Sequence, residues 1–212
     1  MALILSRNDV QRCLTMPEAI QAMREAFGAL HMGQAQMPQR LAVGLPEQGT
    51  ALLMPSLLQT TENEAFSLKV ITVMPRNSLR GLPSLYASVL LLDAATGQTQ
   101  AILEGGWLTA MRTGAVSGLA TDLLARADAD VLALFGAGAQ APTQLLAIDA
   151  VRPLREVRVV NRSDEHYEQL VKTVQSMLGS HGPSIRRAAS AAGRDVPVRA
   201  ARPRGPARVR GH

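Results

Sequence analysis

The stretch VLALFGAGAQA, residues 131–141, constrains the fold more than any other part of the chain. Its apolar opening predicts a buried strand, and the apolar residues that resume after it at helical spacing predict a helix. The turn between them matches G-x-G-x-x-G/A, with Ala141 in the third place. In a strand–turn–helix unit, Gly136 would allow the tight turn and Gly138 would let the backbone approach a pyrophosphate. The stretch therefore predicts the start of a doubly wound α/β domain.

The helix after this turn, at about residues 140–150, begins where a phosphate would lie. A helix N-terminus offers free N–H groups and the positive end of the helix dipole to an anion. A glycine-rich turn alone is weak support, because turns use glycine for conformational reasons. In this context we expect cofactor contacts from the whole turn, namely Gly136, Ala137, Gly138, Ala139 and Gln140.

The end of the next predicted strand, residues 156–161, bears on the choice of dinucleotide. NAD-binding domains hold the ribose 2′-hydroxyl with an acid roughly 20 residues after the glycine turn. Asn161, Arg162 and Ser163 stand there instead. No carboxylate repels a 2′-phosphate, and a guanidinium can pair with one. The sequence favours NADP, with NAD as the alternative.

Residues 1–125 have the pattern of a separate α+β unit. Thr15 and Glu18 form a capping box with Pro17 in the first turn, which predicts an amphipathic helix ending near Gly33. A second helix is predicted from Trp107 to about residue 125. Between the helices, apolar stretches punctuated by prolines 46, 55, 75 and 83 predict an antiparallel or mixed sheet, with strands at 39–43, 49–54, 65–74, 84–92 and 98–103.

Composition narrows the class of protein. Of 212 residues, 47% are apolar and 18% charged, which suits a soluble globular protein. The single cysteine, Cys13, excludes a disulfide framework and fits the cytoplasm, and its place in an amphipathic segment favours a packed thiol. No run reaches the roughly 20 apolar residues of a membrane span. The four histidines are scattered, so we expect no metal site.

The net charge of +5 is concentrated at one end of the chain. Residues 179–212 contain eight arginines, one acid and no periodic apolar pattern, so this segment is expected to be a disordered basic tail. It is interpreted as out-of-frame translation or truncation, with an RNA-binding arm as the less favoured alternative. The expected domains are 1–125, 126–178 (the first part of a Rossmann domain) and the tail 179–212, and no nucleic-acid partner is expected.

Three cations precede the nucleotide domain in apolar or small-residue surroundings. They are Arg40 in QMPQR, Lys69 in AFSLKVITV and Arg112 in LTAMRTGAVSG. A charge inside an apolar strand is costly unless it has a partner, so Lys69 is the most informative of the three. Taken singly, the arginines would be surface residues.

The chain resembles the ornithine cyclodeaminase and mu-crystallin family over about residues 1–178. The resemblance rests on GLPS, LTAMRTGA and GAGAQA in this order. It implies an N-terminal substrate and dimerisation domain, a Rossmann domain, and hydride transfer between a nicotinamide and the α-carbon of an amino or imino acid. By motif match, Arg40, Lys69 and Arg112 would hold the substrate carboxylate, and Lys69 would lie near the reacting carbon. Ser84 and Thr113 would contact the cofactor.

The resemblance also sets limits on the expected chemistry. Cyclodeaminases of this family are expected to have an acid before the Met-Pro pair, where this chain has Leu52 and Leu53 before Met54. That favours plain imine reduction or amino-acid oxidation over cyclisation. The family's catalytic aspartate comes from a region that the sequence lacks, so we expect a truncated chain without turnover. A non-catalytic NADP-binding protein of the mu-crystallin type is the alternative.

Overall fold

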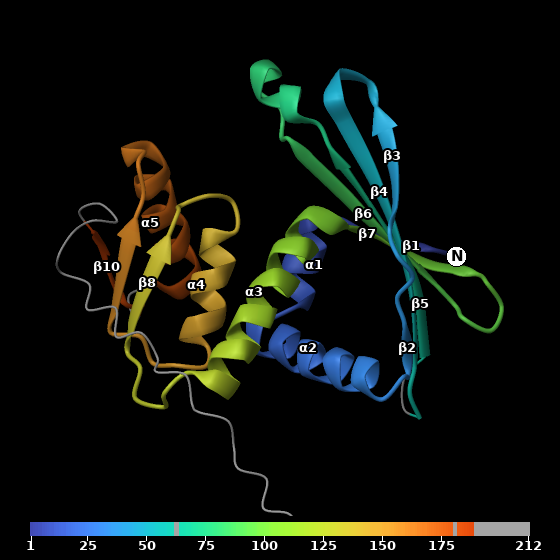
Figure 1. Ribbon diagram of the computed structural model, residues 1–212, viewed down its shortest axis with the longest axis horizontal. Helices are drawn as coiled ribbons and strands as arrows, with labels where there is room; N and C mark the ends of the chain where they lie inside the picture. Colours follow the sequence, from blue (N-terminus) through green and yellow to red (C-terminus); the bar gives the residue numbers. More distant parts are fainter. Residues whose placement is uncertain (62–63, 180–181, 189–212) are drawn as a thin grey trace, which may run out of the picture.

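The protein has two β-sheets with helices between them, as Figure 1 shows. This computed structural model describes residues 1–61, 64–179 and 182–188. The large mixed sheet has the order β1-β7-β6-β5-β4-β2, with β3 also paired to β4, and only the β1–β7 pair is parallel. Its strands are β1 (Leu3–Leu5), β2 (Ala35–Gln36), β3 (Leu41–Leu45), β4 (Gly49–Gln59), β5 (Glu64–Val73), β6 (Leu85–Leu92) and β7 (Thr99–Glu104).

Helices cover one face of the large sheet, and the part of the chain that the structure describes leaves the other face bare (Figure 1). They are α1 (Arg7–Cys13), α2 (Met16–His31) and α3 (Gly105–Leu124), with short 3-10 turns η1 (Pro46–Gln48) and η2 (Pro75–Arg80) at the loops. The predicted capping box of α2 is present, since the backbone N–H of Thr15 donates to the Glu18 carboxylate at 2.9 Å. Buried residues of α2, such as Met16 and Ile20, pack against Met111 of α3.

All five strands predicted for the first unit are present, but Pro55 does not end one. It lies inside β4, paired with Leu68 of β5. On its other side β4 pairs with β3 over residues 49–53 and with β2 over residues 57–58, so Pro55 lies between the two partners. A residue without an N–H is tolerated at such a gap because no ladder bond is lost there.

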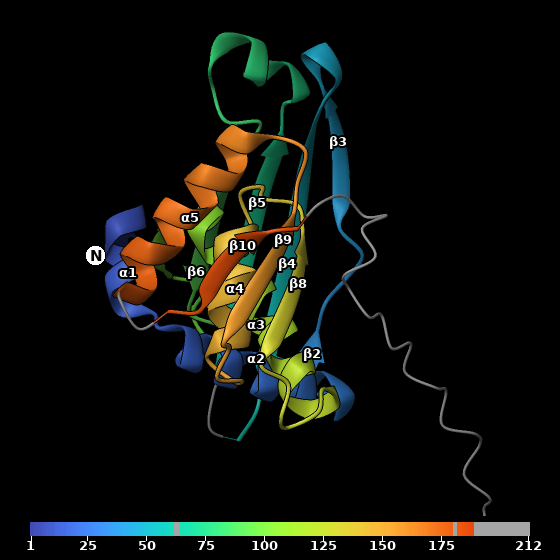
Figure 2. The ribbon, with the colours of Figure 1, turned by 90° about the vertical axis from the view of Figure 1, so that its left-hand side faces the viewer.

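The small sheet is wholly parallel, with the order β10-β9-β8 (Figure 2). The core formed by Leu145, Val157, Val159 and Leu170 joins its inner face to two helices. The sheet thus has the strand–helix alternation predicted from residue 131 on. Its elements are β8 (Val131–Phe135), α4 (Ala141–Asp149), β9 (Glu156–Val160), α5 (Asp164–Leu178) and β10 (Ser184–Arg187).

Strand β10 corrects the expectation that order ends at Leu178. Residues 184–187 lie in the predicted tail, yet they pair in parallel with residues 156–159 of β9. The Tyr167 hydroxyl donates to the Ile185 carbonyl at 3.3 Å, and Ile185 packs against the core of the small sheet. An open strand edge selects its partner through backbone hydrogen bonds, which apolar periodicity does not reveal. Residues 189–212 lie outside the described part of the chain.

The two units are joined through the contact of α3 with α4. A Cβ added at Gly114 would lie 2.4 Å from the carbonyl oxygen of Thr143, and one at Gly118 would lie 2.8 Å from that of Ala147. The sequence GAVSG, which is not a nucleophile motif, therefore lets two helix backbones approach closely. The same helix carries Arg112 and Thr113 just before this contact.

Arg152, in the turn after α4, fastens the C-terminal end of α3. Its guanidinium donates to the carbonyls of Thr121, Asp122, Ala125 and Arg126 at 3.0–3.2 Å. It also pairs with the Asp122 carboxylate at 3.3 Å, and its side chain is only 10% exposed. The last carbonyls of a helix have no partner within the helix, so one side chain from the second unit satisfies the end of α3.

Candidate functional site

The glycine-rich turn after β8 is shaped by backbone geometry and open to the outside. Gly136 has φ +92°, a left-handed value that favours glycine, and its N–H donates to the Val160 carbonyl at the end of β9. An added Cβ at Gly136 or Gly138 would have no atom within 4 Å. Among the described residues, side chains therefore do not fill the space in front of the turn, and a ligand can approach the backbone.

The N-terminus of α4 faces this turn without a side-chain cap. Its N-cap, Gln140, makes no capping hydrogen bond. The Ala141 N–H donates to the Gly138 carbonyl at 2.9 Å and Pro142 has no N–H, so the donors for an anion are the backbone N–H groups of the turn and of Thr143. Gly138, Ala139 and Gln140 are exposed, whereas the side chain of Ala137 is buried in the core of the small sheet. Only the backbone of Ala137 can therefore contact a cofactor. The residues fit the phosphates of a dinucleotide.

The three residues after β9 differ in how they are engaged. The Asn161 side-chain amide donates to the Ser163 carbonyl at 2.7 Å, and the Ser163 hydroxyl accepts from the His166 N–H, so it caps α5. Arg162 is exposed. It makes no ion pair within residues 1–61, 64–179 and 182–188. Of these three residues, Arg162 is therefore the one whose positive charge is available to a ligand.

A second guanidinium at this edge was missed by the sequence reasoning. Arg187 ends β10, donates to the Asn161 carbonyl at 3.1 Å and pairs with the Asp164 carboxylate. The sequence carried no signal for it, because β10 itself was not predicted. Its ion pair holds the turn that presents Arg162.

Lys69 and Arg112 come together on the helix-covered face of the large sheet. Lys69 lies on β5 between Met54 and Val89, on the same face as the buried Ile71. Burial lowers the pKa of the Lys69 ammonium from 10.5 to about 8, and the charge of Arg112 on α3 contributes to this shift. Two neighbouring cations favour an anionic ligand between them. Lys69 and Arg112 are thus electrostatic neighbours, and their role as ligands of a substrate carboxylate stays a prediction.

Arg40 is placed by strand register. It directly precedes β3, whose Leu41 pairs with Leu53. Continuing that register puts Arg40 opposite Met54, the partner of Lys69, at about 10 Å across two strand spacings. Arg40 is exposed, and its role as a carboxylate ligand stays a prediction.

Ser84 and Thr113 differ in their access to the nucleotide turn. Ser84 lines a cavity of about 500 Å³ together with Ala139 and Gln140, so one space joins the first unit to the turn. The Thr113 hydroxyl donates to the Thr109 carbonyl of its own helix at 2.7 Å, and Thr113 does not line this cavity. The Thr113 contact with the cofactor stays a prediction.

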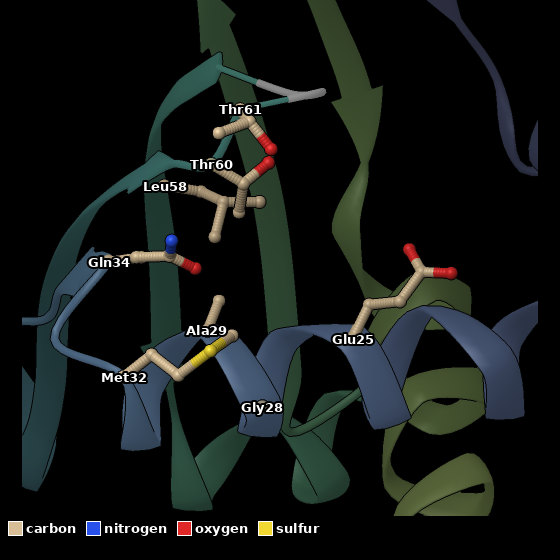
Figure 3. A pocket seen from close by; sticks show the side chains of 8 residues that line it. All are labelled: Glu25, Gly28, Ala29, Met32, Gln34, Leu58, Thr60 and Thr61. Atoms are coloured by element: carbon tan, nitrogen blue, oxygen red, sulfur yellow. The ribbon is translucent and has the colours of Figure 1, made fainter.

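A second cavity, of about 480 Å³, lies between α2 and the end of β4 (Figure 3). Glu25, Met32, Gln34 and Leu58 are among its lining residues. The Glu25 carboxylate accepts a hydrogen bond from Gln21 at 2.8 Å. None of the predicted site residues lines this cavity, and it offers no cation for a carboxylate. The candidate site is therefore the first cavity, whose lining includes Ser84 and Gln140, and helix α3 connects it to Arg112.

Three further sequence expectations concern other classes of site. Among the described residues, no group of three or more His, Cys, Asp or Glu side chains is arranged to hold a metal ion. No helix in that part of the chain is long and apolar enough to cross a membrane. Cys13 is exposed rather than packed, which corrects the prediction, because it lies at the end of the short helix α1.

A pH titration can test the surroundings of Lys69. The unfolded chain holds this proton up to pH 10.5, while the folded chain releases it near pH 8, so the unfolded state binds more protons in that window. The stability of the parent should therefore rise relative to Lys69→Met between about pH 8 and 10.5. Urea unfolding of both chains across this range measures the difference. Parallel curves would show that Lys69 has an ordinary pKa.

The chain matches a known protein family over most of its length. The model of the ornithine cyclodeaminase/mu-crystallin family matches residues 1–196, past the predicted limit at residue 178. A Delta(1)-pyrroline-2-carboxylate reductase of Bacillus cereus is 36% identical over 178 residues, which cover 84% of this chain and 54% of the relative. The chain thus spans about half the length of the curated relatives that it matches.

Two solved structures share the fold. One is the Thermococcus litoralis Delta(1)-pyrroline-2-carboxylate reductase in complex with NADH and L-proline, with TM-score 0.82, 38% identity, and coverage of 89% of this chain and 57% of that one. The other is an archaeal alanine dehydrogenase dimer with bound NAD, with TM-score 0.77, 31% identity, and coverage of 89% and 56%. With its glycine-rich turn and paired cations, the chain belongs to the ornithine cyclodeaminase/mu-crystallin family.

Proposed function

We propose that this chain carries the site of an NAD(P)-dependent oxidoreductase of amino or imino acids. One observation carries the proposal: helix α3 joins the Lys69–Arg112 pair to the open turn at Gly136–Gln140, through its close contact with α4. A carboxylate-binding pair and a phosphate-binding turn are the two features that such a reaction needs. The relatives named as pyrroline-2-carboxylate reductases support this proposal.

The side chains have distinct tasks in the proposed reaction. Arg112 on α3 and Arg40 next to β3 bind the α-carboxylate. Guanidiniums suit this task because their forked N–H groups match the two carboxylate oxygens. Lys69 is mostly protonated at neutral pH with a pKa of about 8, so it can hold a proton at the substrate nitrogen. A bound nicotinamide supplies or accepts the hydride. Leu52 and Leu53 before Met54 offer no acid, which favours imine reduction or amino-acid oxidation.

Turnover by this polypeptide is not expected. A whole dinucleotide site takes about six parallel strands, and the described residues provide three, β8, β9 and β10. We expect weak NADPH binding through the adenosine-phosphate end and no NADPH oxidation with pyrroline-2-carboxylate. NADPH oxidation at an ordinary enzymatic rate would contradict this expectation. Tight binding without turnover would favour the mu-crystallin type of function.

The preference for NADP rests on Arg162 and is tested by one substitution. Arg162→Gln should weaken NADPH binding about 10-fold, because one charge-assisted contact to the 2′-phosphate is lost, and should leave NADH binding unchanged. Calorimetric titration with both dinucleotides measures the two affinities. Arg126→Gln is the control, since Arg126 is exposed and precedes β8, at the opposite end of the strands. Equal loss for both dinucleotides would remove the basis for NADP.

A homodimer through the bare face of the large sheet belongs to the same proposal. Leu41, Val43, Tyr86 and Ile102 all lie on this face and are each at least 40% exposed. An apolar surface of this extent marks an interface, and the archaeal alanine dehydrogenase relative is a dimer. Sedimentation of the parent and of Val43→Lys checks the proposal: the parent should be dimeric and the variant monomeric. A monomeric parent would contradict it.

A further inference from the structure

The cavity that joins Ser84 to the nucleotide turn is also lined by residues that the sequence did not predict for this site. Besides Ala139 and Gln140, Arg7 from the start of α1 and Trp107 from the first turn of α3 line it. Arg7 is the only charged residue among its described lining residues. The cavity therefore combines the uncapped N-terminus of α4 with one full positive charge from the first unit.

The guanidinium of Arg7 is held by the ring of Trp107. Its central carbon lies 5.4 Å from the ring centroid, within the range of a cation–π contact. The Glu104 carboxylate in turn accepts hydrogen bonds from the backbone N–H groups of Gly106 and Trp107, at 2.7 and 2.9 Å, which fixes the start of α3. Within residues 1–61, 64–179 and 182–188, Arg7 has no ion pair. The Trp107 ring therefore fixes the position of the Arg7 guanidinium, and no carboxylate among the described residues neutralises its charge.

The indole N–H of Trp107 adds an independent observation. Its Nε1 atom is buried and has no hydrogen-bond partner within the described residues. An unpaired buried donor is costly, and such an atom in a native protein calls for an explanation. Almost none of the Nε1 surface is exposed, so an oxygen atom of a bound molecule would satisfy it only after a small shift of the ring.

We infer that Arg7 and Trp107 are binding residues for the pyrophosphate of the dinucleotide. The turn supplies backbone N–H groups from one side of the cavity, and Arg7 supplies a guanidinium from the other, so the two negative charges of a pyrophosphate are shared between the two units. With a small shift of the Trp107 ring, the indole N–H would become a further donor for a phosphate or ribose oxygen. This assignment rests on the proposed dinucleotide function and extends it to α1 and α3.

The test compares substitutions at these residues with a matched control. Trp107 is the only tryptophan of the chain, so quenching of its fluorescence reports ligand binding in this cavity. Arg7→Gln should weaken NADPH and NADH about 10-fold by the same factor, because both contain the pyrophosphate. Inorganic pyrophosphate should displace NADPH from the parent, and it should bind Arg7→Gln more weakly. Arg12→Gln, an exposed arginine on the same helix, should bind like the parent.

Trp107→Phe keeps a ring under Arg7 and removes the N–H, and calorimetry should show about 3-fold weaker binding of both dinucleotides. Arg7→Gln that binds both dinucleotides like the parent would overturn the inference and leave the proposed function standing. Weakening of NADPH alone would also overturn it, because only the 2′-phosphate distinguishes the two. A parent that binds neither dinucleotide would overturn the proposed function, and this inference with it.

Discussion

Gly138→Val is expected to abolish dinucleotide binding and to leave the fold intact. A Cβ at this position meets no atom of the described residues within 4 Å, and the backbone of Gly138 does not adopt a positive φ, so a side chain fits the free protein. The same space is where a pyrophosphate would approach the N–H groups at the start of α4. NADPH affinity should fall at least about 100-fold, since the two branched methyl groups occupy the place of the phosphate.

Gly136→Val is the comparison variant, because it separates a loss of binding from a loss of stability. Gly136 has φ +92°, so a valine there is strained and should lower stability as well as binding. For Gly138→Val the free energy of unfolding should stay within about 0.5 kcal/mol of the parent, as for other surface substitutions. Calorimetry with NADPH and urea unfolding give the two quantities. If Gly138→Val binds NADPH like the parent, the dinucleotide does not lie over this turn.

Gly114→Ala is expected to destabilise the protein by about 3 kcal/mol, which is the upper range for overpacking a tight interior contact. The new methyl group would lie 2.4 Å from the Thr143 carbonyl oxygen and 2.8 Å from its carbonyl carbon. Both are backbone atoms of α4, which cannot rotate away as a side-chain end would. The helices must therefore separate, and the core around Met111 and Ala147 must loosen with them.

Gly28→Ala is the matched control for this prediction. Gly28 lies within α2, and an added Cβ there has no atom within 4 Å. The same change of residue should therefore stabilise the protein by about 0.5–1 kcal/mol, the helix propensity gained over glycine. Urea unfolding of both variants measures the contrast in sign. Equal effects at residues 28 and 114 would mean that α3 and α4 are not in close contact in solution.

Most of the fold could be predicted because its elements carry local signals. The capping box of Thr15 and Glu18 marked the start of α2, and apolar stretches broken by prolines and turn residues located the strands β3 to β7. The elements that were missed, such as β1 and β10, have three and four residues. Strands this short form because a neighbouring edge pairs with them, and nothing in their own sequence reports that neighbour.

The candidate site was predictable in part for the same reason. The glycine turn and Lys69 stand out locally, the first by its pattern and the second as a charge in an apolar strand. Arg7 and Trp107 do not, since one begins α1, the other lies in the first turn of α3, and they meet only in the folded chain. The hydrogen bond from the Thr113 hydroxyl to its own helix could not be predicted either, because a threonine hydroxyl in a helix can donate to the helix backbone or to a ligand.

The hydrogen bonds from Arg152 to the end of α3 orient the two units before any ligand binds. Four backbone carbonyls around the end of α3 and the Asp122 carboxylate hold this guanidinium at the junction of the two units. The angle between the paired cations and the glycine turn is therefore set when the chain folds and not when a ligand arrives. Such preorganisation spares the entropic cost of ordering on association, so a ligand that bridges the two units would not have to orient them first.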